Sequence, residues 1–184
     1  MAFPISAFSL PEPDSLLRDN LSLFIDDLKD LPLLDLACGD GHNGLFLASK
    51  GFSMILADRS EEALKQAGDT AASLGVAVSL RHVDLEKENS NTFENEIFSA
   101  VLVFRYLHRP LIPSIRNVLR KGGLLLYETF TTEQAQFGKP INPDHLLKPG
   151  ELFSWFQDWE VIHSFEGIKE NPRKAVAQLI CRKP

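Results

Sequence analysis

The sequence has little of what marks several classes of protein. It contains only two cysteines, Cys38 and Cys181, among 184 residues, which is too few for a disulfide framework and gives no zinc-binding spacing. No apolar run approaches the ~20 residues of a membrane-spanning helix. The start of the chain has no basic residues, and Pro4 interrupts its apolar stretch, so it does not resemble a signal peptide. These absences predict a cytoplasmic protein with no membrane association and no metal site.

Basic charge is scarce as well. The 19 Lys and Arg residues are outnumbered by 25 Asp and Glu residues, the net charge is −6, and the basic residues are scattered along the chain. Nucleic-acid-binding proteins need a clustered basic surface, so nucleic acid is disfavoured as a partner, although a tRNA substrate presented by another protein is compatible with this composition. The 44% of hydrophobic and 24% of charged residues are typical of a globular chain, and the length fits one domain over residues 1–184.

A glycine-spaced stretch near the start of the chain is the most informative local pattern. The apolar run Leu33–Ala37, which has Asp35 inside it, is followed by Gly39, Gly41 and Gly44 and then by apolar residues with helical spacing. This order predicts a strand, a tight turn and a helix. Glycines let the backbone approach a ligand closely, and the unpaired N–H groups of the first helical turn then face that ligand. We therefore expect a nucleotide-like cofactor at this turn.

Two later acids narrow the choice of cofactor. Asp58 ends the second predicted strand, where a carboxylate can accept hydrogen bonds from both ribose hydroxyls, and Asp84 ends the third. Asp58 follows Gly39 by 19 positions, as in dinucleotide-binding proteins, so an NAD-binding oxidoreductase remains an alternative. Asp35 and Asp84 disfavour it, because a carboxylate at position 35 suits a cationic amino or sulfonium group better than a pyrophosphate.

Strand and helix patterns alternate along the rest of the chain. We expect parallel strands over 33–37, 53–57, 77–83, 99–104 and 124–130, with helices over 43–50, 60–74 and 111–120. Two further alternating segments, 159–166 and 175–181, are joined by a short charged turn and predict an antiparallel hairpin. This order predicts an α/β fold: a doubly wound, Rossmann-like, mainly parallel sheet of about seven strands with a C-terminal antiparallel hairpin.

The glycine-spaced stretch also resembles a known family. Asp35–Gly41 resembles the first motif of the class I S-adenosylmethionine-dependent methyltransferases, except that Ala37 stands where the family most often has glycine. Tyr106–Pro110 and Tyr127–Phe130 are similar to the small tellurite-resistance-type (TehB-like) bacterial methyltransferases. The resemblance implies S-adenosyl-L-methionine as cofactor, with S-adenosyl-L-homocysteine as its product.

The resemblance and the strand-end pattern together give a set of cofactor-binding candidates. Asp58 is expected at the ribose and Arg59 over the adenine; the resemblance implies that Asp84 accepts from the adenine amine and that Leu85 offers its N–H to the ring. The full predicted set is Asp35, Ala37, Gly39, Gly41, Asp58, Arg59, Asp84, Leu85, Phe104 and Arg105.

Catalytic candidates follow the fourth predicted strand. His108 is expected to act as the base for a protonated acceptor, with Tyr106 orienting the acceptor; alternatively, His108 only hydrogen-bonds a loop carbonyl. Arg105, Arg109 and Lys139 are candidates to hold an anionic acceptor.

Two segments are expected to cover the site. The irregular, proline-containing segment 131–150 is interpreted as a substrate lid in which Phe137, Lys139, Asn142 and His145 face the substrate. Residues 1–30 are expected to form an extended arm and then a helix, capped by Asp14 and Ser15, which covers either the cofactor or the edge of the sheet.

The sequence thus predicts a methyltransferase with a small-molecule acceptor that is anionic or soft. Two alternatives remain: the NAD-binding oxidoreductase, and a catalytically silent methyltransferase-fold subunit that only binds a partner.

Overall fold

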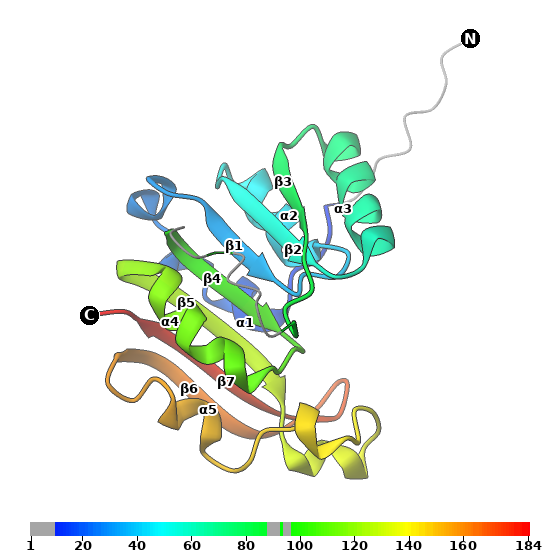
Figure 1. Cartoon of the computed structure of the whole chain (residues 1–184), viewed down its shortest axis with the longest axis vertical. Coiled ribbons are helices and arrows are strands. Elements are labelled where there is room, and N and C mark those ends of the chain that lie inside the picture. Colours follow the sequence, from blue (N-terminus) through cyan, green and yellow to red (C-terminus); the bar gives the residue numbers. More distant parts are fainter. Residues whose placement is uncertain (1–9, 88–92, 94–96) are drawn as a thin grey trace.

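A seven-stranded sheet forms the centre of the molecule in the computed structural model, which describes residues 10–87, 93 and 97–184 (Figure 1). The strands lie in the order β3-β2-β1-β4-β5-β7-β6. Residues 1–9 of the predicted arm lie outside the described residues. The strands are β1 (Leu33–Leu36), β2 (Met54–Asp58), β3 (Val78–His82), β4 (Phe98–Phe104), β5 (Leu119–Phe130), β6 (Glu160–Lys169) and β7 (Lys174–Arg182).

The pairing of the strands confirms the predicted fold class. β3, β2, β1, β4 and β5 are parallel to one another, whereas β7 is antiparallel to both β5 and β6. Every residue of β1 and β4 is buried, as expected for parallel strands that are covered on both faces. The sheet is therefore doubly wound, with an antiparallel hairpin at one edge.

Helices cover both faces of the sheet (Figure 1). One apolar core, which contains Leu17, Leu47 and Leu64, lies between the sheet and α1, α2 and α3. The other, which contains Ile115 and Leu152, lies beneath α4 and α5. The helices are α1 (Ser15–Asp19), α2 (His42–Ser49), α3 (Glu61–Leu74), α4 (Ile112–Val118) and α5 (Glu151–Ser154). Short 3₁₀ turns are η1 (Leu21–Leu23), η2 (Asp26–Lys29), η3 (Arg109–Leu111), η4 (Thr132–Gln136) and η5 (Pro143–His145).

The N-terminal helix is shorter than predicted and has a different position. α1 ends at Asp19, where the Asn20 side chain donates to the Leu16 carbonyl, and two 3₁₀ turns follow. Leu16, Leu17 and Leu28 are buried in the core of one sheet face. This segment therefore packs on a face of the sheet rather than on its edge.

The start of β5 also differs from the prediction. Residues 121–123 do not end a helix, because α4 stops at Val118 and β5 begins at Leu119. The Gly122 N–H donates to the Lys183 carbonyl, and the Lys183 N–H donates to the Gly123 carbonyl. Gly122 has a φ of +72°, a conformation that glycine adopts without strain. These glycines therefore serve strand pairing.

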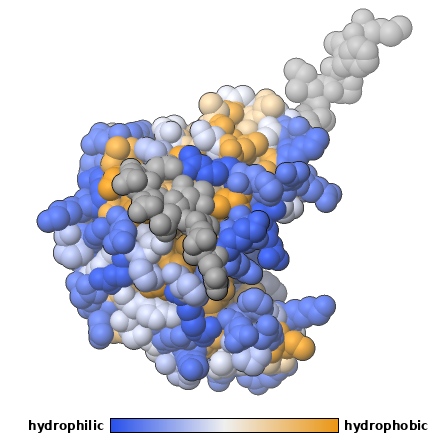
Figure 2. Space-filling view, viewed as in Figure 1, coloured by the Kyte–Doolittle hydropathy of each residue, from blue (hydrophilic) through white to orange (hydrophobic). Residues whose placement is uncertain are grey.

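The face of the molecule shown in Figure 2 is mainly hydrophilic, with its visible apolar residues in separate groups. The longest helix in the described ranges is α3, with 14 residues; none there is long and apolar enough to cross a membrane.

Candidate active site

A cavity of about 640 Å³ lies at the edge where β1, β2, β4 and β5 end. This is the edge at which open parallel sheets bind ligands. Its residues fall into two groups separated by Arg105, Tyr106 and Leu107, which follow β4. We call the first group the strand-end side: Ala37, Asp58, Arg59, Val83, Asp84, Leu85 and Glu86. We call the second group the loop side: Phe130, Lys139, Pro140, Ile141, Asn142 and His145.

The glycine turn is held by two carboxylates. Asp58 accepts a hydrogen bond from the Gly39 N–H at 2.8 Å, and Asp35 accepts one from the Gly44 N–H at 2.9 Å. A Cβ added at Gly44 would collide with Leu56, so this glycine is required by packing. A Cβ added at Gly39 would meet no atom within 4 Å. The turn is thus packed tightly on its inner side and open above Gly39.

Asp35 lies within the packed side of the glycine turn. The residue is only 3% exposed, and it is not among the cavity residues. Burial raises the pKa of this carboxyl to about 7, although the hydrogen bond from Gly44 opposes that shift. Asp35 therefore supports the turn, and its contact with the cofactor stays a prediction.

Asp58 remains available to a ligand while it supports the turn. One carboxylate oxygen accepts from Gly39 and the other accepts from the Ser60 N–H at 2.8 Å. A carboxylate has about four acceptor positions, so two of these remain for hydroxyl donors in the cavity. Ser60 itself caps α3 by accepting from the Ala63 N–H.

The other predicted adenine contacts lie on the same side. Asp84 accepts from the Glu86 N–H at 3.1 Å, and its side chain is 34% exposed. Leu85 is buried in the cavity wall, and Arg59 reaches across to Glu86 at 3.8 Å. The structure therefore brings Asp58, Arg59, Asp84 and Leu85 together.

Two non-glycine residues of the cavity have left-handed backbone conformations. Ala37 and Arg105 each have a φ of +54°, a conformation that costs an L-residue roughly 1–2 kcal/mol. The conformation at Ala37 explains why glycine suits this position of the motif. Backbone strain of this kind is concentrated at functional sites.

Arg105 lines the cavity, but its guanidinium is already paired. It donates to Asp14 at 2.7 Å, and Asp14 also contacts the His42 ring at 2.9 Å and the Asn43 amide at 3.0 Å. Burial opposes ionisation of Asp14, but the hydrogen bonds from His42 and Asn43 and the charge of Arg105 hold its pKa well below the usual value. Asp14 does not cap α1 with its side chain; it fastens the N-terminal segment to the glycine turn.

Tyr106 faces the strand-end side. Burial raises the pKa of its phenol, and the neighbouring charges that influence it most are those of Glu86, Arg59 and Asp84. Within the described ranges, no group hydrogen-bonds its buried hydroxyl. Tyr106 is therefore nearer to the predicted cofactor residues than to the loop that we expected to hold the acceptor.

Three predicted residues lie outside the cavity lining. Phe104 is 6% exposed and belongs to the core beneath α1 and α2, because alternate residues of β4 face opposite sides of the sheet. Gly39 and Gly41 form the turn beside the cavity. A Cβ at Gly41 would lie 2.8 Å from Leu56, which explains glycine there by packing.

His108 also lies outside the cavity lining. It is half-buried at the start of η3. The alternative hydrogen bond to a loop carbonyl is absent too, among the residues that the structure describes. The hydrogen bond considered as the alternative is therefore not seen, and the role of His108 as a base stays a prediction.

The side chains of Arg109 and Phe137 interact with residues that are not part of the cavity lining. Arg109 forms a two-pronged pair with Glu151, at 2.7 and 2.9 Å, so it does not offer its guanidinium to the cavity. The ring of Phe137 packs under Arg173, with 4.8 Å from the guanidinium carbon to the ring centroid. Lys139, in contrast, lines the loop side as predicted.

Sequence reasoning missed several residues of the site. Glu86, Ile141 and Pro140 line the cavity but belong to no motif. Asp14 was interpreted as a helix cap because it directly precedes an apolar helical pattern; only its contacts with residues far along the chain reveal its link to Arg105.

Comparisons with known proteins agree with this geometry. A family model described as "Tellurite resistance protein TehB" matches residues 23–176. A probable S-adenosyl-L-methionine-dependent methyltransferase TehB from Haemophilus influenzae is 27% identical over 143 residues, which are 75% of this chain and 49% of the relative. A tRNA 5-carboxymethoxyuridine methyltransferase from Escherichia coli is 22% identical over 158 residues, which cover 72% of this chain and 60% of the relative.

Solved structures show the same fold. The crystal structure of TehB from Haemophilus influenzae superposes with a TM-score of 0.73 at 19% identity, over 91% of this chain and 61% of that one. The chain spans about half the length of the TehB relative that it matches. Because the family model matches most of its residues, the chain belongs to the tellurite resistance protein TehB family.

Proposed function

We propose that this chain is an S-adenosyl-L-methionine-dependent methyltransferase that acts on a small acceptor. The observation that carries the proposal is the placing of Asp58 and Asp84 on one side of a cavity beside the glycine turn. Relatives in the same family are named as methyltransferases that use this cofactor, which supports the choice over other nucleotides.

The residues present fit this cofactor. Asp58 has unused acceptor positions for the ribose hydroxyls, and the space above Gly39 is open where a side chain would otherwise stand. Asp84 and Leu85 would meet the adenine, and the Tyr106 hydroxyl would gain a polar partner. When bound, the cofactor supplies an electrophilic methyl group on a sulfonium. The protein then mainly has to align an acceptor with that methyl group.

The loop side supports a small acceptor. Lys139 supplies a positive charge, Asn142 an amide and Ile141 an apolar surface, which together suit a compact anion with an apolar part. The names of the relatives include tellurite resistance and ubiquinone O-methylation, so the family alone does not choose between a soft and an oxygen acceptor.

Nucleic acid is the second acceptor class, because the relative from Escherichia coli is named as a tRNA methyltransferase. The net charge of −6 disfavours it. If tRNA were the acceptor, the chain would bind it with an affinity that falls steeply with salt; we expect no such binding.

We also propose a cytoplasmic location.

Two alternatives from the sequence need a direct test. Since Asp35 is buried and outside the cavity lining, the case against an NAD-binding oxidoreductase rests mainly on Asp84 and the family. Isothermal titration with S-adenosyl-L-homocysteine and with NADH separates the two functions. We expect binding of the former only; tight binding of NADH alone would contradict the proposal. Cofactor binding without turnover would favour the silent subunit.

A further inference from the structure

One histidine lines the cavity, and its backbone is fixed from both sides. His145 is the last residue of η5 and belongs to the loop side. Arg109 donates to the carbonyl of Asp144 at 2.9 Å and to the carbonyl of Leu146 at 2.9 Å. The guanidinium therefore holds the two residues that flank His145.

Arg109 is itself held firmly. Glu151 accepts two of its N–H groups and also accepts from the Lys148 N–H at 2.8 Å. This arrangement is a fork-to-fork pair, which gives geometric precision as well as attraction. Arg109 directly follows His108 after β4, so the pair joins the sheet edge to the segment that carries His145.

The same segment is tied to the end of β5. The Leu147 N–H donates to the Phe130 carbonyl at 2.9 Å, and the Thr132 N–H donates to the Leu147 carbonyl at 2.9 Å. Phe130 lines the cavity. The backbone on the C-terminal side of His145 is therefore fixed to the cavity wall.

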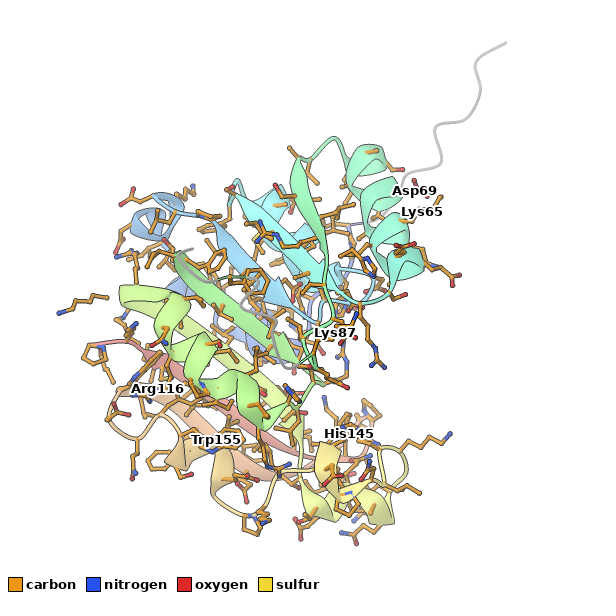
Figure 3. The ribbon with its side chains drawn as sticks, in the orientation of Figure 1. Lys65, Asp69, Lys87, Arg116, His145 and Trp155 are labelled. Atoms are coloured by element: carbon orange, nitrogen blue, oxygen red, sulfur yellow. The ribbon has the colours of Figure 1, made fainter. Side chains whose placement is uncertain are left out.

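The imidazole, in contrast, is uncommitted. Its residue is exposed, and within the described part of the chain nothing donates to or accepts from its ring. In Figure 3, His145 lies on the yellow segment, and it lines the same cavity as the strand-end residues. The backbone on both sides of His145 is therefore held at the cavity, and both ring nitrogens of its imidazole are available to a substrate there.

We propose that His145 is the base that takes the proton from the acceptor, and that Arg109 is a positioning residue that acts through it. The inference rests on the proposed methyltransferase function and makes it more specific. It implies an acceptor whose attacking oxygen or nitrogen carries a proton. As that atom bonds to the methyl carbon, the carbon–sulfur bond breaks with its electron pair going to sulfur, and the acceptor proton moves to the imidazole.

Lys139 on the same side suits an anionic group elsewhere on that acceptor. A soft metalloid oxyanion attacks through a lone pair and has no proton to lose there, so its methylation would not need His145. Replacing His145 therefore also distinguishes a protonated oxygen or nitrogen acceptor from a soft oxyanion.

The experiment compares His145→Ala and His145→Gln with the wild type. Labelled S-adenosyl-L-methionine is supplied with a bacterial small-molecule extract, and methyl incorporation is measured across pH with and without added imidazole. We expect both variants to lose roughly 100-fold in incorporation, to lose the rise of rate with pH, and to regain part of it in imidazole. Their affinity for S-adenosyl-L-homocysteine, measured by titration calorimetry, should equal that of the wild type.

The matched control is His163→Ala, whose ring contacts Gln178 on the hairpin; it should behave as the wild type. Unchanged incorporation in His145→Ala would overturn the inference, as would a loss seen only in His108→Ala. A wild type that binds S-adenosyl-L-homocysteine but labels nothing in the extract would also overturn it and would favour the silent subunit. A wild type that binds none would instead refute the proposed function.

Discussion

The two sides of the cavity are built in different ways. On the strand-end side, Asp58 is the last residue of β2, Asp84 lies two residues after β3, and Gly39 belongs to the turn between β1 and α2. On the loop side, Lys139 and His145 lie in a segment without regular strands, which is held in place by Arg109 and Glu151, 42 residues apart. One side is built from local patterns, and the other from contacts between distant residues.

This difference suits two separate tasks, the binding of a cofactor and the binding of an acceptor. The cofactor that the name of the TehB relative gives can be bound by groups that a parallel sheet places at one edge. An acceptor that varies between relatives needs residues that change without disturbing the sheet, and a surface segment allows this. The predictions below test whether the two sides are separable.

The largest effect on cofactor binding should come from the strand-end side. Asp58→Ala removes the acceptor for the Gly39 N–H and for the ribose hydroxyls. Because hydrogen bonds to charged groups contribute about 1.5–3 kcal/mol, we expect roughly 10- to 100-fold weaker binding of S-adenosyl-L-homocysteine in titration calorimetry. Asp69→Ala, at a surface pair with Lys65 on α3 (Figure 3), is the control. Equal affinity in the wild type and Asp58→Ala would remove Asp58 from the site.

Stability should depend on the same side. Gly44→Ala places a methyl group against Leu56, and overpacking of this kind costs typically 1–3 kcal/mol. Thermal unfolding should show a Tm lower by several degrees. In the comparison variant Gly68→Ala, the added Cβ meets only the end of the Leu80 side chain, at 3.0 Å. If Gly44→Ala were as stable as the wild type, the turn would be looser than described.

The loop side should affect turnover and not cofactor binding. Arg109→Ala frees the backbone on both sides of His145, and we expect incorporation from the extract to fall by about tenfold, which is about 1.4 kcal/mol. Added imidazole should restore little of it, because His145 itself is still present. Arg116→Ala is matched, since Arg116 on α4 forms a similar fork with Asp158 and also donates to the carbonyl of Trp155, which directly follows α5 (Figure 3). A weaker affinity for S-adenosyl-L-homocysteine in Arg109→Ala would show that the two sides are coupled.

The smallest effect should be the pH dependence of the stability that the Arg109–Glu151 pair contributes. The hydrogen bonds from Arg109 lower the pKa of Glu151, so its stabilising contribution is present above the unfolded pKa of about 4.3 and is lost as pH falls through the folded value. Glu151→Gln should therefore be less stable than the wild type near pH 7 by about 0.5 kcal/mol, and the difference should vanish in acid. Denaturant unfolding at the two pH values measures it; a constant difference would contradict the ionic origin.

The sequence was most informative about site residues that lie at or just after the end of a strand. The strand order of an α/β sheet places Asp58 and Asp84 at one edge, and both line the cavity. The burial of Asp35 could not be predicted, because a motif gives a residue's position in the chain and not the direction of its side chain. Asp35 lies in β1 just before the turn, and its carboxylate accepts a hydrogen bond from the Gly44 N–H in the packed interior.

The loop side could not be predicted in the same way. Arg109 and His108 are adjacent and lie in one motif, yet the former is an anchor and the latter lies outside the cavity lining. That Arg109 pairs with Glu151 depends on how residues 131–150 fold back onto β5, and no local pattern encodes that path. His145 was named as a residue of the segment, but only the hydrogen bonds to its neighbours give it a specific role.

The most direct test of the account is a crystal structure with S-adenosyl-L-homocysteine. It should show the ribose hydroxyls on the Asp58 carboxylate and the adenine beside Asp84 and Leu85, with His145 facing the sulfur across an open space for the acceptor. A ligand bound elsewhere, or a ribose that avoids Asp58, would contradict the assignment of the strand-end side to the methyl donor.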